Sequence, residues 1–194
     1  GGVIYLGSFS KTFAPGLRVG WVVAPHGIRE KLVLASEAAI LSPSSFAQMV
    51  LAEYFESHDW KGQIDTFRGV YRERRDAMTN ALASYLPDIA HTNPAGGFYL
   101  WLTLPEGLDS KDMLPRAITE LVAYTPGTAF FANGQGQRHL RLAFCYPEPD
   151  FITEGIRRLA RVITEERELV ETFGPASSET PVAANLESPP PEVT

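Results

Sequence analysis

The feature that most constrains the fold is a long amphipathic stretch between residues 61 and 86. Its apolar side chains recur at helical spacing and line one face; they are Ile64, Phe67, Tyr71, Met78, Leu82 and Tyr85. Pro87 ends the pattern, because a proline disfavours helical conformation in the residue before it. A helix with one apolar face has to bury that face against another element. The stretch therefore predicts a packed core built from several elements.

Short apolar runs on both sides of this helix predict strands, and other stretches predict helices. Strands are expected at residues 3–6, 17–23, 98–104, 122–124 and 139–145, and helices at 28–39, 46–56, 111–121 and 151–170. Asp150 is the expected N-cap of the last helix, because its carboxylate can accept hydrogen bonds from the first free N–H groups. Strands and helices intermix along the whole chain, which predicts an α/β or α+β fold.

The loop between the first two predicted strands carries a lysine, Lys11, and begins at Ser8. Open α/β sheets bind ligands beyond the carboxyl ends of their strands, which is where this loop lies. Ser8 and Ser10 offer hydroxyl groups, and Arg18, expected in the next strand, offers a planar donor fork that suits phosphate. A lysine that forms an imine must lose its proton, which a nearby cation or burial favours. These residues predict a phosphate site beside a reactive amine.

Two other interpretations of the loop have to be weighed. A lysine in a serine-rich loop is more often exposed to solvent without any catalytic role, and these residues taken alone favour that outcome. The Lys11-Thr12 pair also matches the end of a Walker phosphate loop, but that motif requires glycines where this chain has Tyr5 and Ser10. The Walker interpretation therefore fails.

A second arginine, Arg141, lies in the alternating segment 139–145. In a strand, Leu140 and Leu142 share one face, and Arg141 shares the other with two small side chains, Ala143 and Cys145. The small neighbours leave room for a ligand beside the guanidinium, and a carboxylate is its natural bidentate partner. An arginine at a strand edge that faces water is the alternative, and this segment alone favours it.

These segments resemble the class I/II aminotransferases of pyridoxal phosphate (PLP) fold type I, over about residues 3–170. The resemblance is closest to the branch that contains 2-aminoadipate and kynurenine aminotransferases. The run SFSKTFAPGLRVGW is similar to the family's cofactor-lysine signature. The runs NPAGGFYLW, PGTAFFANG and LRLAF follow in the family's order and resemble three further motifs.

The resemblance implies a role for each matching residue. It implies that Lys11 binds PLP and moves a proton, that Ser8 and Arg18 bind the cofactor's phosphate, and that Arg141 binds the substrate α-carboxylate. Ser10 also matches the signature and is a further candidate for cofactor binding. The implied reaction moves an amino group between an amino acid and a 2-oxo acid, and the implied assembly is a homodimer. Aromatic, aliphatic and aminoadipate-like amino donors are all compatible with these motifs.

The resemblance also implies a domain organisation. Residues 1–59 are expected to be a remnant of the large mixed-sheet, PLP-binding domain, and residues 60–173 a nearly complete small α+β domain. Residues 174–194, rich in proline and without a basic residue, are expected to be disordered. A chain that opens in a strand suggests a fragment, and the family's remaining active-site parts lie upstream of its lysine. The isolated chain is therefore expected to have little or no transaminase activity.

Composition excludes several other classes of protein. The net charge of −6 means that the chain has no excess of basic residues, which nucleic-acid binding favours. No apolar run approaches the length of a membrane span. The single cysteine, Cys145, cannot form an internal disulfide and fits a reducing cytoplasm. The four histidines lack metal-ligand spacing, so no metal is expected.

Two alternative functions stay open at this point. One is the PLP-binding effector domain of a transcription regulator that reuses the aminotransferase fold, with a DNA-binding domain in front of it. The other is a catalytically dead relative that only associates with a partner. A basic helix-turn-helix segment would favour the regulator, whereas the match through the FFANG and LRLAF runs favours the enzyme.

Overall fold

The computed structural model describes residues 2–174, so the prediction of a disordered tail lies almost wholly outside the described residues. The chain divides into two compact units, one that ends at Val70 and one that begins at Tyr71. This division falls inside the long helix predicted from the amphipathic pattern, α3 (Trp60–Tyr85). The domain boundaries drawn from the sequence stay a prediction.

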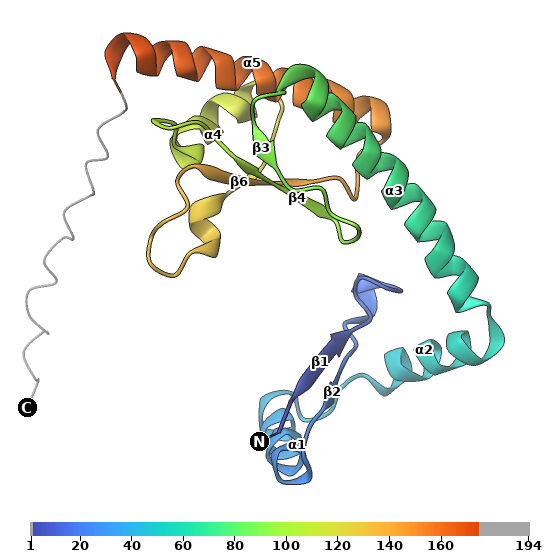
Figure 1. Ribbon diagram of the computed structural model, residues 1–194. Coiled ribbons are helices and arrows are strands. Elements are labelled where there is room, and N and C mark those ends of the chain that lie inside the picture. The colour runs from blue at the N-terminus through green and yellow to red at the C-terminus, as the bar shows by residue number, and fades with distance from the viewer. Residues whose placement is uncertain (1, 175–194) are drawn as a thin grey trace, which may run out of the picture. The chain divides into compact units, whose positions relative to one another are not determined.

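The first unit contains a two-stranded antiparallel hairpin and two helices (Figure 1). Strand β1 (Tyr5–Ser8) pairs with β2 (Gly20–Val23), so that Tyr5 lies opposite Val23 and Ser8 lies opposite Gly20. A short 3-10 helix, η1 (Pro15–Leu17), lies between the strands. The helices are α1 (His26–Ile40) and α2 (Ser45–Ser57), and Ser44 caps α2 by accepting a hydrogen bond from the Ala47 N–H.

Two predictions for this hairpin are wrong in detail. The first strand begins two residues later than expected and takes in Ser8, which was placed in the loop. Arg18 does not lie in the second strand; it follows η1 with φ 54° and ψ 39°, in the left-handed region. The cause is the Pro15-Gly16 turn, which continues as 3-10 helix because proline presets the backbone for it. The chain then leaves η1 through a left-handed residue before β2 begins.

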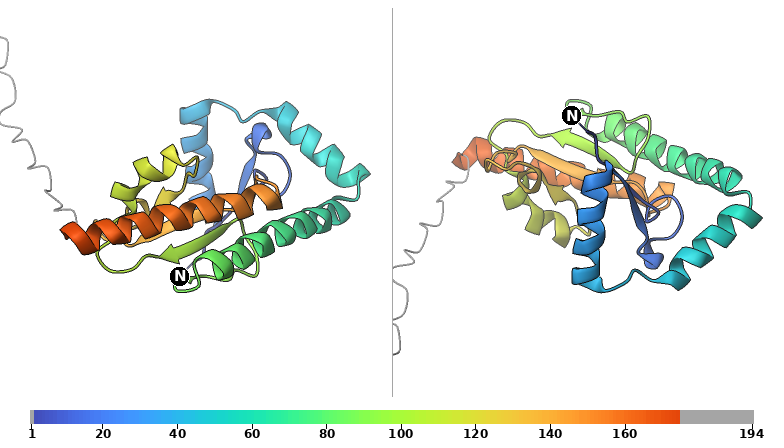
Figure 2. Two further views of the ribbon diagram at one scale, coloured as in Figure 1. Left: turned by 90° about the horizontal axis from the view of Figure 1, so that it is seen from above. Right: turned by 90° about the horizontal axis from the view of Figure 1, so that it is seen from below.

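The second unit is built on a four-stranded antiparallel sheet in the order β3-β4-β6-β5. These strands are β3 (Ala90–His91), β4 (Tyr99–Thr103), β6 (His139–Ala143) and β5 (Thr125–Pro126). The end of α3, α4 (Ser110–Thr119) and α5 (Pro149–Phe173) gather on one side of the sheet (Figure 2). Alternation along β4 and β6 sends their leucines into the core, and for β6 it puts Leu140 and Leu142 on one face, as predicted. The side chains that are fully or nearly fully buried here are Leu100, Leu102, Leu140, Leu142 and Phe144.

One predicted strand and one predicted helix cap of the second unit are also wrong. Residues 122–124 form no strand; the Val122 N–H donates to the Ala117 carbonyl at 2.9 Å, a bond that closes the end of α4 instead of pairing with a strand. The N-cap of α5 is Glu148 and not Asp150, because Pro149 takes the first helical position, where its missing N–H costs nothing. Asp150 lies in the first turn, where the helix dipole favours a negative charge.

Within residues 2–174, no helix combines the length and the hydropathy that crossing a bilayer requires. The same residues contain no group of three or more His, Cys, Asp or Glu side chains placed to hold a metal ion.

Candidate cofactor and carboxylate sites

Lys11 lies in a compact loop that connects β1 to η1. The Phe9 N–H donates to the Val19 carbonyl at 3.1 Å, and the Phe13 and Ala14 N–H groups both donate to the Phe9 carbonyl, at 2.9 and 3.1 Å. These bonds close a turn whose exposed tip includes Lys11. The Lys11 amine has no hydrogen bond or ion pair within the described part of the chain, so it is free to react with a ligand.

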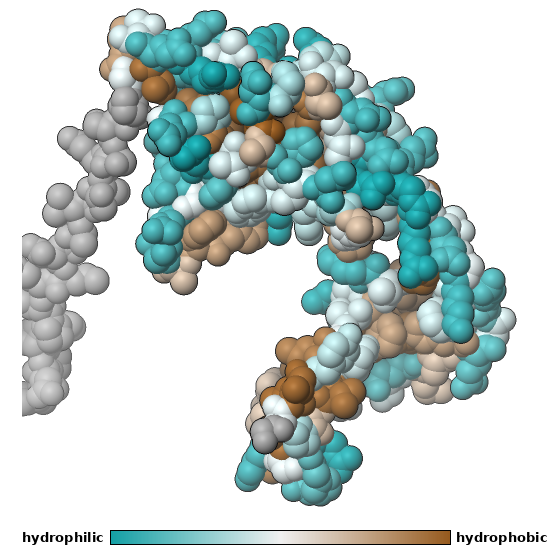
Figure 3. Space-filling view, viewed as in Figure 1, coloured by the Kyte–Doolittle hydropathy of each residue, from teal (hydrophilic) through white to brown (hydrophobic). Residues whose placement is uncertain are grey.

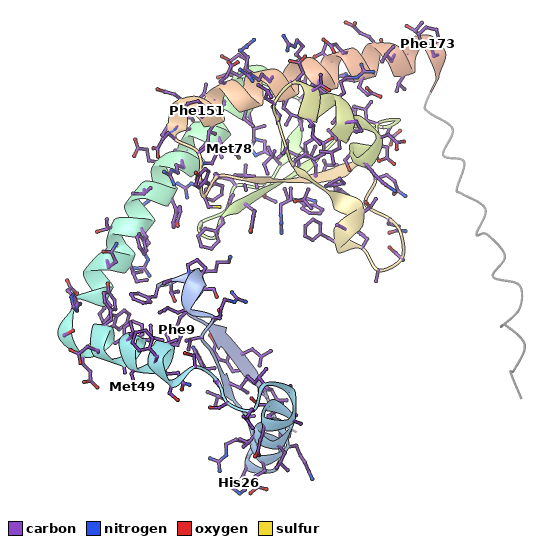
Figure 4. The ribbon with its side chains drawn as sticks, turned by 180° about the vertical axis from the view of Figure 1, so that it is seen from behind. Phe9, His26, Met49, Met78, Phe151 and Phe173 are labelled. Atoms are coloured by element: carbon purple, nitrogen blue, oxygen red, sulfur yellow. The ribbon has the colours of Figure 1, made fainter. Side chains whose placement is uncertain are left out.

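Aromatic contacts hold this turn against α2. The Phe13 ring lies 4.3 Å from the Tyr54 ring and 6.1 Å from the Phe55 ring, centroid to centroid, and Phe9 lies 5.4 Å from Phe55. Figure 4 shows Phe9 turned toward α2. Phe9 and Phe13 lie on either side of Lys11 in the sequence, so these contacts fix both ends of its turn. This role was not predicted, although two phenylalanines around Lys11 in a polar loop are a signal of it in the sequence.

The three candidate phosphate ligands belong to the same hairpin. The Ser8 Oγ accepts a hydrogen bond from the Ser10 N–H at 3.1 Å, which fixes the strand end. The Arg18 guanidinium donates to the Pro15 carbonyl at 3.3 Å, and its other N–H groups have no partner among residues 2–174. Because Ser8 lies opposite Gly20, Ser8 and Arg18 are at the same end of the hairpin. Two hydroxyls, a guanidinium and an amine are a donor set that fits a phosphate ester bearing an aldehyde.

Arg141 lies at the centre of the sheet in the second unit, with Trp101 of β4 opposite it on one side and Thr125 of β5 on the other. Its Cζ is 4.0 Å from the centroid of the Tyr99 ring and 4.6 Å from that of Phe130. The side chain is half-buried. In the described residues it has no hydrogen bond and no ion pair, so its N–H groups are available to a ligand.

An aromatic cluster lies beside Arg141 on the face of the sheet opposite α3, α4 and α5. Trp101 meets Phe130 edge-on at 5.3 Å and lies 5.5 Å from His139, which stacks on Phe131 at 5.7 Å. This aromatic cluster was not predicted from the sequence. The alternation of Tyr99 and Trp101 on one face of the strand could have placed both beside Arg141.

The loop that carries Phe130 is closed by two glycines. A Cβ on Gly127 would lie 2.5 Å from the Gly136 carbonyl oxygen, and Gly136 has a φ of 97°. Only glycine permits this approach of the two backbones. The 3-10 helix η2 (Gly127–Phe130) begins at the first of these glycines, so Phe130 lies against Arg141 from a conformationally constrained turn.

The resolved pKa shifts belong to structural groups of the second unit. Burial, with the charges of Asp109 and Glu166, raises the pKa of the Tyr124 phenol, which donates to the Ser110 carbonyl at 2.7 Å. Hydrogen bonds from Arg157 and Arg158 lower the pKa of the exposed Glu154 carboxyl to about 2. Within residues 2–174 neither group has a hydrogen bond to the residues around Arg141, so we assign both to the support of the fold.

Comparison with known proteins places the chain in a family. Residues 2–159 match the family described as aminotransferase class I and II. The chain is 46% identical over 168 residues to aromatic-amino-acid aminotransferase 1 of Thermococcus litoralis, a match that covers 86% of this chain and 40% of that protein. It is 31% identical over 166 residues to an HTH-type transcriptional regulator of Bacillus subtilis, covering 85% of this chain and 34% of that protein.

Solved structures agree with this assignment. The α-aminoadipate aminotransferase of Thermus thermophilus, complexed with N-(5'-phosphopyridoxyl)-L-leucine, superposes with a TM-score of 0.82 at 40% identity, covering 87% of this chain and 43% of that one. The kynurenine aminotransferase of Pyrococcus horikoshii, in complex with PMP, gives a TM-score of 0.81 at 45% identity, covering 84% and 41%. The α/β, fold type I prediction is confirmed. The chain spans about 40% of the length of these relatives, and it belongs to the class I and II aminotransferase family.

Proposed function

We propose that this chain is the C-terminal portion of a PLP-dependent aminotransferase that moves an amino group between an amino acid and a 2-oxo acid. The observation that carries the proposal is the Lys11 hairpin, where an amine without a partner among residues 2–174 shares one short segment with Ser8, Ser10 and Arg18. Relatives with aminotransferase names, two of them solved with pyridoxyl ligands, support the same cofactor here.

Each group in the proposal has a defined task. Bound PLP supplies an electron-withdrawing ring that makes the substrate Cα–H acidic. Lys11 Nζ holds the cofactor and, once released by the incoming amino acid, takes and returns the Cα proton. Ser8, Ser10 and Arg18 bind the phosphate and so fix the cofactor's position. Arg141 binds the substrate α-carboxylate through two parallel hydrogen bonds.

The surface of the first unit supports the wider assembly. The β1-β2 hairpin carries apolar side chains that are largely exposed, as the brown area over it in Figure 3 shows; they are Val3, Tyr5, Leu6, Val22 and Val23. Large exposed apolar patches usually mark an interaction surface. We propose that residues 1–59 belong to a larger mixed-sheet domain whose remaining strands cover this hairpin, that residues 60–173 form the small domain, and that the whole enzyme is a cytoplasmic homodimer.

Reduction with borohydride in the presence of PLP tests the cofactor assignment directly. We expect mass spectrometry of the full-length protein to find the pyridoxyl group on Lys11, and the Lys11→Ala variant to lose both the adduct and transamination. Lys31→Ala, which removes another exposed lysine of the first unit, is the control and should retain both. An adduct on other lysines, or turnover by Lys11→Ala, would overturn the proposal. The 194-residue chain alone should show little or no turnover.

The regulator alternative has support of its own, because an HTH-type transcriptional regulator is 31% identical to this chain. Such a protein would bind PLP through Lys11 and would also bind DNA. Transamination by the full-length protein without DNA binding favours the enzyme, whereas sequence-specific DNA binding without transamination favours the regulator.

A further inference from the structure

The arginine that we assign to the substrate carboxylate is covered by two aromatic rings. Tyr99 reaches it from β4, where it is the diagonal neighbour of Arg141 across the strand pair. Phe130 reaches it from the end of η2. Within residues 2–174 the two rings do not pack against each other, although Cζ of Arg141 lies 4.0 Å from the centroid of Tyr99 and 4.6 Å from that of Phe130. They therefore approach the guanidinium from different sides.

This arrangement leaves the hydrogen-bonding edge of Arg141 free. A guanidinium donates its hydrogen bonds in its own plane, while its two faces are weakly hydrated and stack on aromatic rings. Three arginines in residues 2–174 have no side-chain hydrogen bond or ion pair: Arg72, Arg141 and Arg167. The other two are exposed, whereas Arg141 is half-buried. A half-buried arginine that is held by rings and not by a carboxylate is ready to bind one.

Phe130 is itself supported. Trp101 packs edge-on against it at 5.3 Å, and the two glycines at the ends of its loop fix the backbone that carries it. Tyr99 belongs to β4, a central strand of the sheet, and its pairing with Ala143 of β6 constrains its backbone. Both rings are thus attached to rigid elements, and the rotamer of Arg141 is set before any ligand arrives.

We propose that Tyr99 and Phe130 are positioning residues that hold the Arg141 guanidinium between their rings and so determine the affinity for the substrate α-carboxylate. The inference rests on the proposed function, because it needs a carboxylate substrate. It predicts an effect on binding that is the same for every amino acid, since the carboxylate is common to all of them.

Steady-state kinetics of the full-length protein tests the inference. Tyr99→Leu and Phe130→Leu should each raise KM about two- to fivefold, and their combination about tenfold, with kcat unchanged within about twofold. Tyr99→Phe keeps the ring and should restore the original KM. Phe131→Leu is the matched control, because this neighbouring ring contacts His139 and Trp101 but not Arg141.

A second readout does not depend on turnover. In a ¹H–¹⁵N spectrum of the full-length protein, the Nε–H signal of Arg141, assigned by its loss in Arg141→Lys, should carry an upfield shift from the two ring currents. Tyr99→Leu and Phe130→Leu should each move it downfield, while Phe131→Leu leaves it in place.

The outcomes separate this inference from the proposed function. If Arg141→Lys raises KM while Tyr99→Leu and Phe130→Leu do not, the two rings have no positioning role, and the function stands. If both ring variants lower kcat without a change in KM, or act on some amino acids only, the inference is also wrong. If the full-length protein shows no transamination, the proposed function is wrong, and the positioning role of the two rings, which depends on that function, is wrong as well.

Discussion

Arg18 provides a test that separates a cost in stability from a gain in function. It is one of three non-glycine residues in the described chain with positive φ, and the phosphate role is proposed for its side chain. Replacing it with glycine removes both the guanidinium and the strain of a left-handed L-residue. Replacing it with alanine removes the same guanidinium and keeps the strain. The two variants therefore differ only in the backbone strain and the conformational entropy at residue 18.

The expected difference follows from the backbone geometry. An L-residue in the left-handed region costs about 1 to 2 kcal/mol, and Arg18 is at φ 54° and ψ 39°. Glycine avoids this cost but gives up roughly 0.5 to 1 kcal/mol of conformational entropy relative to alanine. Arg18→Gly should therefore be more stable than Arg18→Ala by about 0.5 to 1 kcal/mol. The bond from the guanidinium to the Pro15 carbonyl is lost in both variants, so it cancels from the comparison.

Urea unfolding of the apo-protein measures this difference. With a slope of about 2 kcal/mol per M, the midpoint of Arg18→Gly should exceed that of Arg18→Ala by about 0.25–0.5 M. Both variants should bind PLP roughly 10- to 150-fold more weakly than the original protein, because each loses charged hydrogen bonds to phosphate. Equal midpoints would refute the strain argument, and unchanged PLP affinity would refute the phosphate role.

Three further predictions concern the second unit. Leu142→Ala removes a core side chain of β6 that is 4% exposed and should lower the free energy of unfolding by about 2 to 5 kcal/mol. Ile118→Ala, at a position that is 54% exposed, should lower it by about 0.5 kcal/mol or less, and chemical denaturation compares the two variants. Tyr124→Phe should lower the free energy of unfolding by about 1 kcal/mol. Because burial raises the folded pKa of Tyr124 above its unfolded value, its contribution to stability should be present below about pH 10 and should decrease as the pH rises further. Unfolding measured at several pH values checks this. For Glu154, the folded pKa of about 2 lies below the unfolded value of 4.5, so its contribution should be present above pH 4.5 and lost as the pH falls toward 2; a carboxyl carbon NMR titration showing a pKa of 4.5 would contradict this.

The sequence determined much of this protein through local patterns. Helical spacing of apolar residues placed α3 to within one residue at each end, because a periodic apolar face is visible without knowledge of its partner. Alternation along residues 139–145 separated Leu140 and Leu142 from Arg141, and the structure buries both leucines. The family was recognisable because residue types at fixed spacing along the chain carry the cofactor signature.

Only the tertiary structure decided the features that depend on residues distant in sequence. Proline presets the 3-10 turn of η1 locally, but the left-handed conformation of Arg18 depends on how the chain then returns to pair with β1. The pairing of β4 with β6 sets Tyr99 beside Arg141, and the closure of the Gly127–Gly136 loop brings Phe130 to the same guanidinium. Sequence spacing predicts which face of an element a side chain occupies, but strand register and loop closure determine which side chains meet there.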